Sequence, residues 1–451
     1  MPFSKKKKIN RSHIVKNIQG KFSLLRQNIT KSKDKYPFFG NLIEFGYQNL
    51  YNLIFVIEKF FQLFKARLKY GKLYYTKLYW TNPDKIQNHS KIRLKWHYYL
   101  HVLGGDWDKP EVIFENTLYF QSFRQRFKEG KNWEDTEYYK KVLNQLLSGK
   151  EYYGIKSKEA WDQRFKKADK VYYSIKKYNF KRQRDLPYSM RRFKFFNITS
   201  NLDEITIDIG RDGELLLKHG KNRLAIVKVL NISKIPIIII ARHKEWMKFR
   251  SYLIYFVKKF QCGALNEVIT HPDLQNVPYK QNDIEFNVIK ENTTSSKGTL
   301  LDLSANFGYF CIKFEEKGFD TFAVEDNKIK LYFLKKIKQI ENKKFKVIQK
   351  PIFEYKKDEE LEFDVVLAFD VFHRYLETEE KFLGLIRFLK RLKVKELFFC
   401  SLNHKEFIKK NYYKLFSPNK LANFIIENSC LNNAKFIGKT KSSKLIFKIF
   451  L

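Results

Sequence analysis

The residues with the clearest chemical potential follow the apolar run that opens TLLDLSANFGYF, at positions 299–310. Asp302 closes that run, and Ser304, Asn306 and Gly308 follow it at every second position. Asparagine and glycine tolerate the left-handed backbone that a tight turn requires, and glycine also lets a ligand approach the backbone. These residue types predict a ligand-binding turn between a buried strand and a helix.

Two further acid-tipped segments follow the turn. Glu325 lies 23 positions after Asp302 and ends the run GFDTFAV. An acid about 20 residues after such a turn, at the end of the second strand, can accept hydrogen bonds from ribose hydroxyls. The third segment, EFDVVLAFDVFHRYL, carries Asp370 and His373 near its end. His373 is the candidate general base, and a structural imidazole is the equal alternative.

The elements that must position these residues alternate between strands and helices from residue 283 to residue 451. This alternation predicts a doubly wound parallel sheet covered by helices on both faces. Ligands of such sheets bind beyond the carboxyl ends of the strands, at the point where the strand order reverses. The turn at residues 302–308 follows the first strand and therefore lies at that point.

The three acid-tipped segments resemble motifs I, II and IV of the class I S-adenosylmethionine-dependent methyltransferases. Of the family pattern D-x-G-x-G-x-G the chain keeps Asp302 and Gly308, with Ser304 and Asn306 at the first two glycine positions. The resemblance implies a Rossmann-like methyltransferase domain that closes with an antiparallel hairpin and binds S-adenosyl-L-methionine. It implies these roles: Asp302, Ser304, Asn306 and Gly308 along the cofactor, Glu325 at its ribose, Ile352 and Phe353 at adenine, and Asp370 and His373 facing the acceptor.

A smaller α+β domain is predicted before it, over residues 186–282. The segments 205–209 and 215–217 flank a GRDG turn as a hairpin, residues 223–230 form a helix, and IPIIIIA is a buried strand. The stretch resembles the ParB/sulfiredoxin-like fold, where a G-x-x-R element opens a helix. The resemblance implies a phosphate or nucleotide site at Gly220, Lys221, Asn222 and Arg223. The alternative is a structural turn in which Arg223 pairs with Glu204 or Asp208.

Residues 1–185 are rich in lysine and tyrosine and are predicted to be mostly helical. The turn HVLGGDWDKPEVIF contains Trp107, interpreted as a core side chain in preference to an exposed recognition element. Residues 49–71 are predicted to form an amphipathic helix with basic residues along one side. The apolar run of this helix is too short to span a bilayer. Packing against the rest of the chain is its favoured role, with peripheral contact to an anionic membrane as the alternative.

Composition restricts the partners. The 451 residues carry a net charge of +40, which suits a nucleic acid but also follows from an AT-rich coding sequence. The four cysteines are Cys262, Cys311, Cys400 and Cys430. They form no CxxC pair, so neither a metal site nor a disulfide framework is predicted. No secretory signal is recognisable, and a cytoplasmic protein is expected.

Two hypotheses about function emerge. The first is a methyltransferase that acts on a small-molecule or glycan acceptor, slightly preferred over RNA, and is fused to the ParB-like module. The second is a nucleotide- or nucleic-acid-binding protein whose methyltransferase fold is not catalytic.

Overall fold

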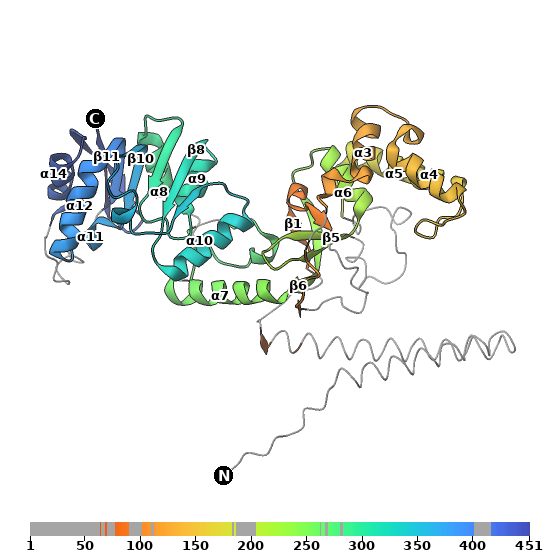
Figure 1. Cartoon of the computed structure of the whole chain (residues 1–451), viewed down its shortest axis with the longest axis horizontal. Coiled ribbons are helices and arrows are strands. Elements are labelled where there is room, and N and C mark those ends of the chain that lie inside the picture. Colours follow the sequence, from red (N-terminus) through yellow and green to blue (C-terminus); the bar gives the residue numbers. More distant parts are fainter. Residues whose placement is uncertain are drawn as a thin grey trace, which may run out of the picture. The chain divides into compact units, whose positions relative to one another are not determined.

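The structure is a computed structural model of the whole chain (Figure 1). It describes residues 64, 68–69, 77–89, 102–109, 112–182, 185, 204–261, 263–266, 269–279, 283–400 and 416–451. The amphipathic helix predicted for residues 49–71 lies almost wholly outside these ranges, and so does Cys262. Within them, no helix combines the length and the apolar character that crossing a membrane requires.

The described part of the N-terminal region contains three α-helices: α3 (Leu118–Lys128), α4 (Glu137–Leu147) and α5 (Lys158–Tyr178). It also contains short strands, which the prediction of a mostly helical region did not include: Tyr79–Thr81, Asn88–His89 and Val102–Leu103. The 3-10 turns η3 (Phe114–Asn116) and η4 (Trp133–Asp135) precede α3 and α4. Thr117 and Ser157 cap α3 and α5 by accepting from Phe120 N and Ala160 N. An aromatic core joins the helices, with the ring of Trp133 4.4 Å from that of Phe165.

A six-stranded sheet forms the middle region. Its strands are β1 (Tyr79–Thr81), β2 (Asn88–His89), β3 (Val102–Leu103), β4 (Ile205–Ile209), β5 (Leu215–His219) and β6 (Ile235–His243). Five of them run in the order β1-β6-β4-β5-β2. The antiparallel β4–β5 hairpin and the buried strand β6 confirm the predicted strands. Helix α6 (Lys221–Val229) begins two residues earlier than expected, and η1 (Pro83–Lys85), α7 (Lys244–Phe260) and η8 (Pro272–Leu274) complete the region.

The GGDWD turn fixes the hairpin turn of the middle sheet. Asp108 is 2% exposed and accepts hydrogen bonds from the Arg211 backbone N–H at 2.6 Å and from its guanidinium at 2.7 Å. Asp106 also accepts from Arg211, at 2.7 Å. Trp107 is 3% exposed, so it is the core side chain that the sequence predicts. The role of the turn is therefore structural: two acids hold Arg211 of the GRDG turn.

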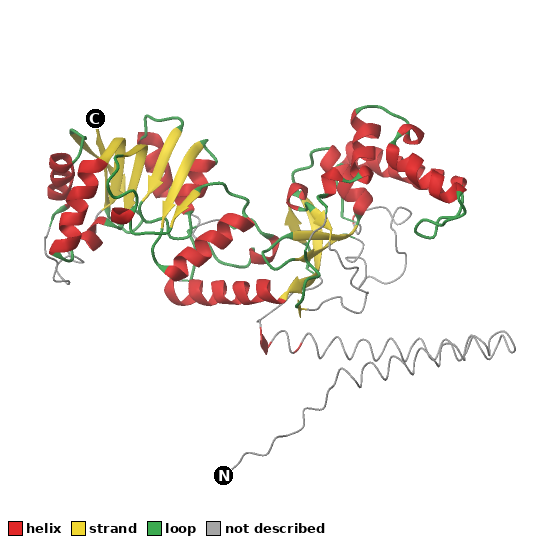
Figure 2. Cartoon of the chain, in the orientation of Figure 1, coloured by secondary structure: helices red, strands yellow, loops and turns green. Residues whose placement is uncertain are grey.

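The C-terminal region contains a seven-stranded sheet, drawn in yellow between red helices in Figure 2. Its strands are β7 (Gly298–Asp302), β8 (Phe319–Val324), β9 (Lys346–Ile348), β10 (Leu361–Phe369), β11 (Leu392–Cys400), β12 (Asn433–Lys439) and β13 (Leu445–Phe450). The order is β12-β13-β11-β10-β7-β8-β9. Strands β7 to β11 pair in parallel, and β13 is antiparallel to β11 and β12. This confirms the doubly wound sheet with a closing antiparallel hairpin.

Alternate residues of the central strands enter two cores, one on each face of this sheet. Leu301, Val366 and Ala368 pack on one face, and Leu300 and Val365 pack on the other. Both faces of a central strand are buried because helices cover both, which explains the unbroken apolar runs in the sequence. The helices are α8 (Ile284–Asn292), α9 (Tyr309–Glu315), α10 (Lys328–Ile340), η9 (Ile352–Glu354), α11 (Phe372–Tyr375), α12 (Glu379–Arg391) and α14 (Pro418–Asn428).

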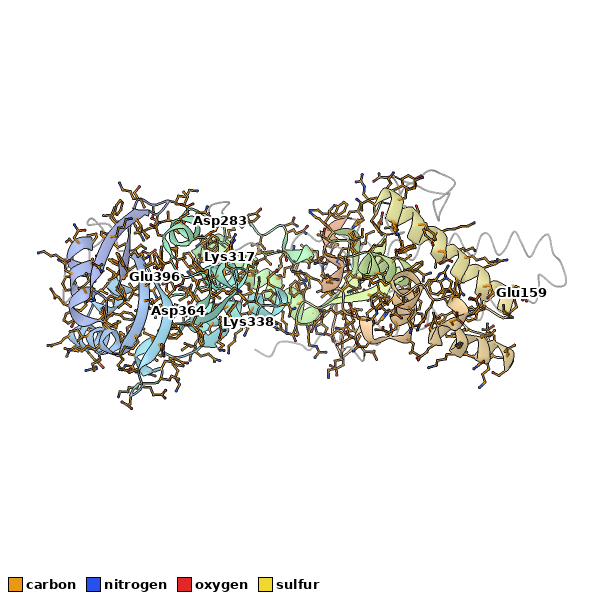
Figure 3. The ribbon with its side chains drawn as sticks, turned by 90° about the horizontal axis from the view of Figure 1, so that it is seen from above. Glu159, Asp283, Lys317, Lys338, Asp364 and Glu396 are labelled. Carbon is orange, nitrogen blue, oxygen red and sulfur yellow. The ribbon has the colours of Figure 1, made fainter. Side chains whose placement is uncertain are left out.

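One carboxylate sets the register of the two central strands. Asp364 lies on β10 (Figure 3) and accepts from the backbone N–H of Thr299 on β7 at 2.7 Å. Lys395 on β11 pairs with the same carboxylate at 2.7 Å. These contacts keep the pKa of Asp364 below its usual range, chiefly through the hydrogen bond from Lys395. Three adjacent strands are thereby aligned, and so are their carboxyl ends.

Candidate functional site

The turn between β7 and α9 contains two left-handed residues, Asn306 with φ 56° and Gly308 with φ 94°. Asn306 is a residue type that tolerates this conformation, and glycine has no steric penalty there. A Cβ added at Gly308 would lie 3.0 Å from Leu334 Cδ1 and 3.2 Å from Phe345 Cζ. The helix α9 can therefore begin where it does only with a glycine at this position.

Gly308→Ala is expected to reduce the free energy of unfolding by about 2 kcal/mol, since a strained φ costs roughly 1 kcal/mol and the close contacts add to it. Gly318→Ala is the matched control. Gly318 has φ 91°, but its added Cβ would meet only Lys297 Cγ, at 4.0 Å. Urea denaturation of both variants measures the difference, and equal losses would mean that the contacts at Gly308 relax without cost.

Ser304, where the resembling family has glycine, does not have a positive φ. Its hydroxyl donates to the Phe369 carbonyl at the end of β10, at 2.6 Å. Its backbone N–H donates to Asp302 Oδ1 at 3.1 Å, and Asp302 is 1% exposed. The serine therefore ties the turn to the neighbouring strand and requires no glycine conformation.

Glu325 follows β8 and is 6% exposed. Its Oε1 accepts from the Asn327 backbone N–H at 3.0 Å. Burial raises the pKa of Glu325, while the hydrogen bond from Asn327 and the charges of Lys330 and Arg374 oppose the rise. The carboxylate is thus held in place at the edge of the sheet where the parallel strands end.

Two cavities open at this edge. One of about 480 Å³ is lined by Ser304, Asn306, Glu325, Asp370 and Arg374, together with the tip of the β12–β13 hairpin. A smaller one of about 200 Å³ adjoins it through Ser304, Glu325 and Arg374 and extends to Ile352. The larger volume falls within the range of about 300–1,000 Å³ typical of small-molecule sites. The structure therefore brings the turn, Glu325, Ile352 and Asp370 together around one space.

Not every residue named from the sequence lines that space. The Phe353 ring packs 4.5 Å from the Tyr375 ring, and a Cβ on Gly384 would lie 2.9 Å from it. Four residues predicted for the site line neither of the two cavities: Asp302, Gly308, Phe353 and His373. Arg374, the neighbour of His373 on α11, lines both of them. The sequence offered no signal that distinguished these adjacent positions, because the direction of a four-residue helix depends on its packing.

Asp370 has an ionic partner that no sequence pattern indicates. Lys444, 74 residues later at the start of the β13 segment, donates to Asp370 Oδ1 at 2.7 Å. Asp370 has φ 52°, and its side chain is 50% exposed whereas that of Lys444 is 14% exposed. Asp370 lines the larger cavity, and its pair with Lys444 links the end of β10 to the final hairpin.

The predicted nucleotide site of the middle region lies at the start of α6. Gly220 has φ 96°, and its added Cβ would lie 3.1 Å from Ile205 Cα. The Lys221 ammonium lies 3.8 Å from the Tyr119 ring centroid, and Asn222 Oδ1 accepts from the Tyr119 hydroxyl. Arg223 pairs with Glu204 at 3.8 Å.

All three side chains of the Gly220 turn thus contact the protein itself, and the pair with Glu204 is one of the two pairs that the structural interpretation of the turn allows. A nucleotide at this turn stays a prediction.

No family model matches the sequence, and no curated protein matches it. Solved structures match in part. The bifunctional kinase-methyltransferase WbdD is 15% identical with a TM-score of 0.34, covering 44% of this chain and 45% of that one. The N-methyltransferase NodS from Bradyrhizobium japonicum is 13% identical with a TM-score of 0.30, covering 37% and 92%. The 16S rRNA methyltransferase RsmC of T. Thermophilus is 14% identical with a TM-score of 0.29, covering 40% and 46%.

The chain thus spans less than half of the length of WbdD and RsmC. All three neighbours are methyltransferases, but the class of fold rests on the strand order of the sheet itself. That class is a doubly wound α/β protein with an antiparallel closing hairpin.

Proposed function

We propose that the C-terminal region is an S-adenosylmethionine-dependent methyltransferase. The observation that carries the proposal is the cavity beyond the carboxyl ends of β7, β8 and β10, where the left-handed turn, Glu325 and Asp370 converge. The strand order places this cavity at the switch point, where doubly wound sheets bind their ligands.

The residues around the cavity fit the chemistry of this cofactor. Asn306 Oδ1 is buried, and no described residue donates a hydrogen bond to it. A buried acceptor of this kind costs free energy unless a donor is supplied, and the ammonium of the methionine moiety is one. Glu325 is the acceptor for the ribose hydroxyls, and Ile352, 1% exposed, gives an apolar wall for adenine.

When bound, S-adenosylmethionine would supply an activated methyl group. The chain's own residues then have to position an acceptor in line with it, which is where most of the rate enhancement arises. Asp370, beside Lys444 and half exposed, would accept a hydrogen bond from the acceptor. His373 would remove a proton only for an acceptor that must lose one, and Arg374 lies closer to the cavity than His373 does.

Isothermal calorimetry of the intact protein with S-adenosylmethionine and S-adenosylhomocysteine tests the proposal. Saturable heat with a 1:1 stoichiometry is expected for both. The complete absence of heat with the folded wild-type protein would reject it in favour of the second hypothesis, a binding protein that uses this fold as a scaffold.

The affinity for S-adenosylhomocysteine is expected to rise as the pH increases above the ordinary pKa of a glutamate. Burial raises the pKa of Glu325, so the free protein holds this proton to a higher pH than an exposed glutamate would, and the carboxylate is the form that accepts from both ribose hydroxyls. Binding therefore releases a proton and strengthens as the pH increases through the raised pKa. Calorimetry at several pH values measures the slope, and Glu325→Gln is expected to remove it. A slope that persists in Glu325→Gln would assign the titration to another group.

Substitutions of Asp370 and His373 are expected to affect the turnover of the acceptor in different ways. Asp370→Asn should leave cofactor affinity within about twofold and weaken acceptor turnover, because a lost hydrogen bond to a charged group costs roughly 1.5–3 kcal/mol. His373→Ala should lower turnover only where the acceptor must be deprotonated, and the loss should depend on pH. Scintillation counting of labelled methyl incorporated into candidate glycans and RNA measures both. Unchanged turnover in Asp370→Asn would remove this residue from the acceptor site.

A further inference from the structure

Helix α5 has one apolar face and one basic face. Trp161, Phe165, Ala168, Tyr172 and Ile175 are buried against the other N-terminal helices. The opposite side has four exposed side chains at intervals of four, three and four residues. We call them the basic stripe: Lys166, Lys170, Tyr173 and Lys177. Such intervals place the side chains in one line along a helix. From Lys166 to Lys177 the line is about 16 Å long at 1.5 Å per residue.

Two acids of α5 make their direct contacts with residues outside the basic stripe. Asp162 accepts from the Tyr139 hydroxyl and pairs with Lys158 at 2.8 Å. Asp169 accepts from Trp133 Nε1 at 2.9 Å and pairs with Arg126 at 3.3 Å. Among the described residues, none forms an ion pair with Lys166, Lys170 or Lys177.

Glu159 lies on the same side but at the first turn of the helix (Figure 3), where hydrogen bonds from its own backbone N–H and from Ser157 lower its pKa. The acids therefore stabilise the fold of this region, and the lysines of the stripe are left to face outward.

Tyr173 lies between these lysines and is 58% exposed. Its ring packs edge to face on Tyr172, 5.3 Å away, and Tyr172 stacks on Phe127 with a centroid distance of 3.7 Å. The second tyrosine near this end of the helix, Tyr178, is 53% exposed and has Lys177 over its ring at 5.0 Å. An exposed ring that is braced from below and flanked by cations is suited to stack with a nucleobase.

The alternative polyanion is an anionic membrane surface. A helix that binds in a bilayer interface inserts its apolar face among the lipids. The apolar face of α5 is already buried in the protein, with Trp161 fully covered and Phe165 4% exposed. The outward face has tyrosines and lysines instead of leucine, isoleucine or phenylalanine, which favours a nucleic acid.

We infer that the basic stripe of α5 binds single-stranded nucleic acid, with Lys166, Lys170 and Lys177 on successive phosphates and Tyr173 stacked on a base. RNA and DNA share this chemistry, and the experiment distinguishes them. The inference does not depend on methyl transfer, because every measurement below is made without a cofactor.

The test is fluorescence anisotropy of the full-length protein with labelled 20-nucleotide oligouridylate and oligothymidylate over a range of salt concentrations. The triple variant Lys166→Gln/Lys170→Gln/Lys177→Gln is compared with Lys317→Gln/Lys335→Gln/Lys390→Gln, which removes the same charge from exposed lysines of the C-terminal region. Three lost phosphate contacts are expected to lower the salt slope by about 2 and the affinity about a hundredfold at 0.1 M salt, whereas the control stays near wild type.

Tyr173→Ala is expected to weaken binding between fivefold and a hundredfold, which corresponds to the loss of one stacked base, and Tyr173→Phe to retain it. Tyr153→Ala, at a tyrosine 63% exposed elsewhere, is the control. The affinities of the wild-type protein for oligouridylate and oligothymidylate are also compared. The oligonucleotide that binds more tightly identifies RNA or DNA as the ligand. Equal losses in both triple variants, tighter binding to a 20-base-pair duplex, or binding only to vesicles of phosphatidylcholine and phosphatidylserine would each overturn the inference.

Discussion

Replacing Glu325 by alanine is expected to weaken the binding of S-adenosylmethionine and S-adenosylhomocysteine about a hundredfold. The carboxylate is 6% exposed, lies at the end of β8 and lines the same cavity as residues 304–306 of the turn. A hydrogen bond to a charged group contributes roughly 1.5–3 kcal/mol, and a ribose offers two hydroxyls to one carboxylate. Calorimetric titration measures the loss, which should be the same for both ligands because they share the ribose.

Asp320→Ala provides the matched control for Glu325→Ala. Asp320 also belongs to β8, but its side chain is 55% exposed near the other end of the strand. Its removal should change neither affinity nor stability by more than about 1 kcal/mol. If the wild-type protein binds and Glu325→Ala binds equally well, the cofactor lies elsewhere. If no variant and no wild-type protein binds, methyl transfer itself is rejected.

Asp273→Asn is expected to cost about 3–5 kcal/mol of unfolding free energy, the largest effect on stability that we predict. Asp273 is 2% exposed and accepts from Arg242 at 2.7 Å and from Trp246 Nε1 at 2.8 Å. Burial alone would raise the pKa of Asp273, but the charge and hydrogen bonds of Arg242, with smaller contributions from Arg250 and Trp246, together outweigh burial and lower that pKa. The stabilisation is therefore present above the usual pKa of aspartate and is lost as the pH falls through the lowered one. Asparagine leaves the fully buried Arg242 without its counterion, which explains the size of the effect.

Urea denaturation compares Asp273→Asn with Glu359→Gln, which breaks an exposed pair with Lys356 and should cost less than about 1 kcal/mol. The double variant Arg242→Met/Asp273→Asn should lose less than the sum of the two single variants, because it leaves no uncompensated charge at Arg242. Additive losses, or a loss in Asp273→Asn no greater than that of the control, would show that the pair does not determine the stability of the middle region.

Local chemistry made much of the C-terminal sheet predictable. The apolar run that ends at Asp302 and the one that follows Asp364 predicted strands of a sheet covered on both faces, and the structure has β7 and β10 there. Asn306 and Gly308 were expected to be tolerant of left-handed backbone, and both have a positive φ. Such features depend on steric contacts within a few residues, so the residue types themselves contain the information. The ends of helices were less predictable. Helix α6 begins at Lys221, two residues before the predicted start, because capping competes with packing at the ends.

Contacts between distant segments were not predictable in the same way. The sequence pointed to His373, yet Arg374 is the α11 residue that lines both cavities. It suggested two partners for Arg223, and only packing selected Glu204 over Asp208. It could not connect Asp370 with Lys444, or Asp108 with Arg211, because these pairs are separated by 74 and 103 residues.

The sequence by itself determined where the chain turns, which strands are buried and which carboxylates end them, since backbone sterics and side-chain periodicity act over a few residues. The tertiary structure alone decided which side chains share the cavity and that the Ser304 hydroxyl binds the Phe369 carbonyl. It also decided that Asp162 and Asp169 of α5 contact the neighbouring elements, while the lysines of the basic stripe face outward. The physical reason is that these contacts form only when packed cores fix the direction of each helix and strand relative to its neighbours.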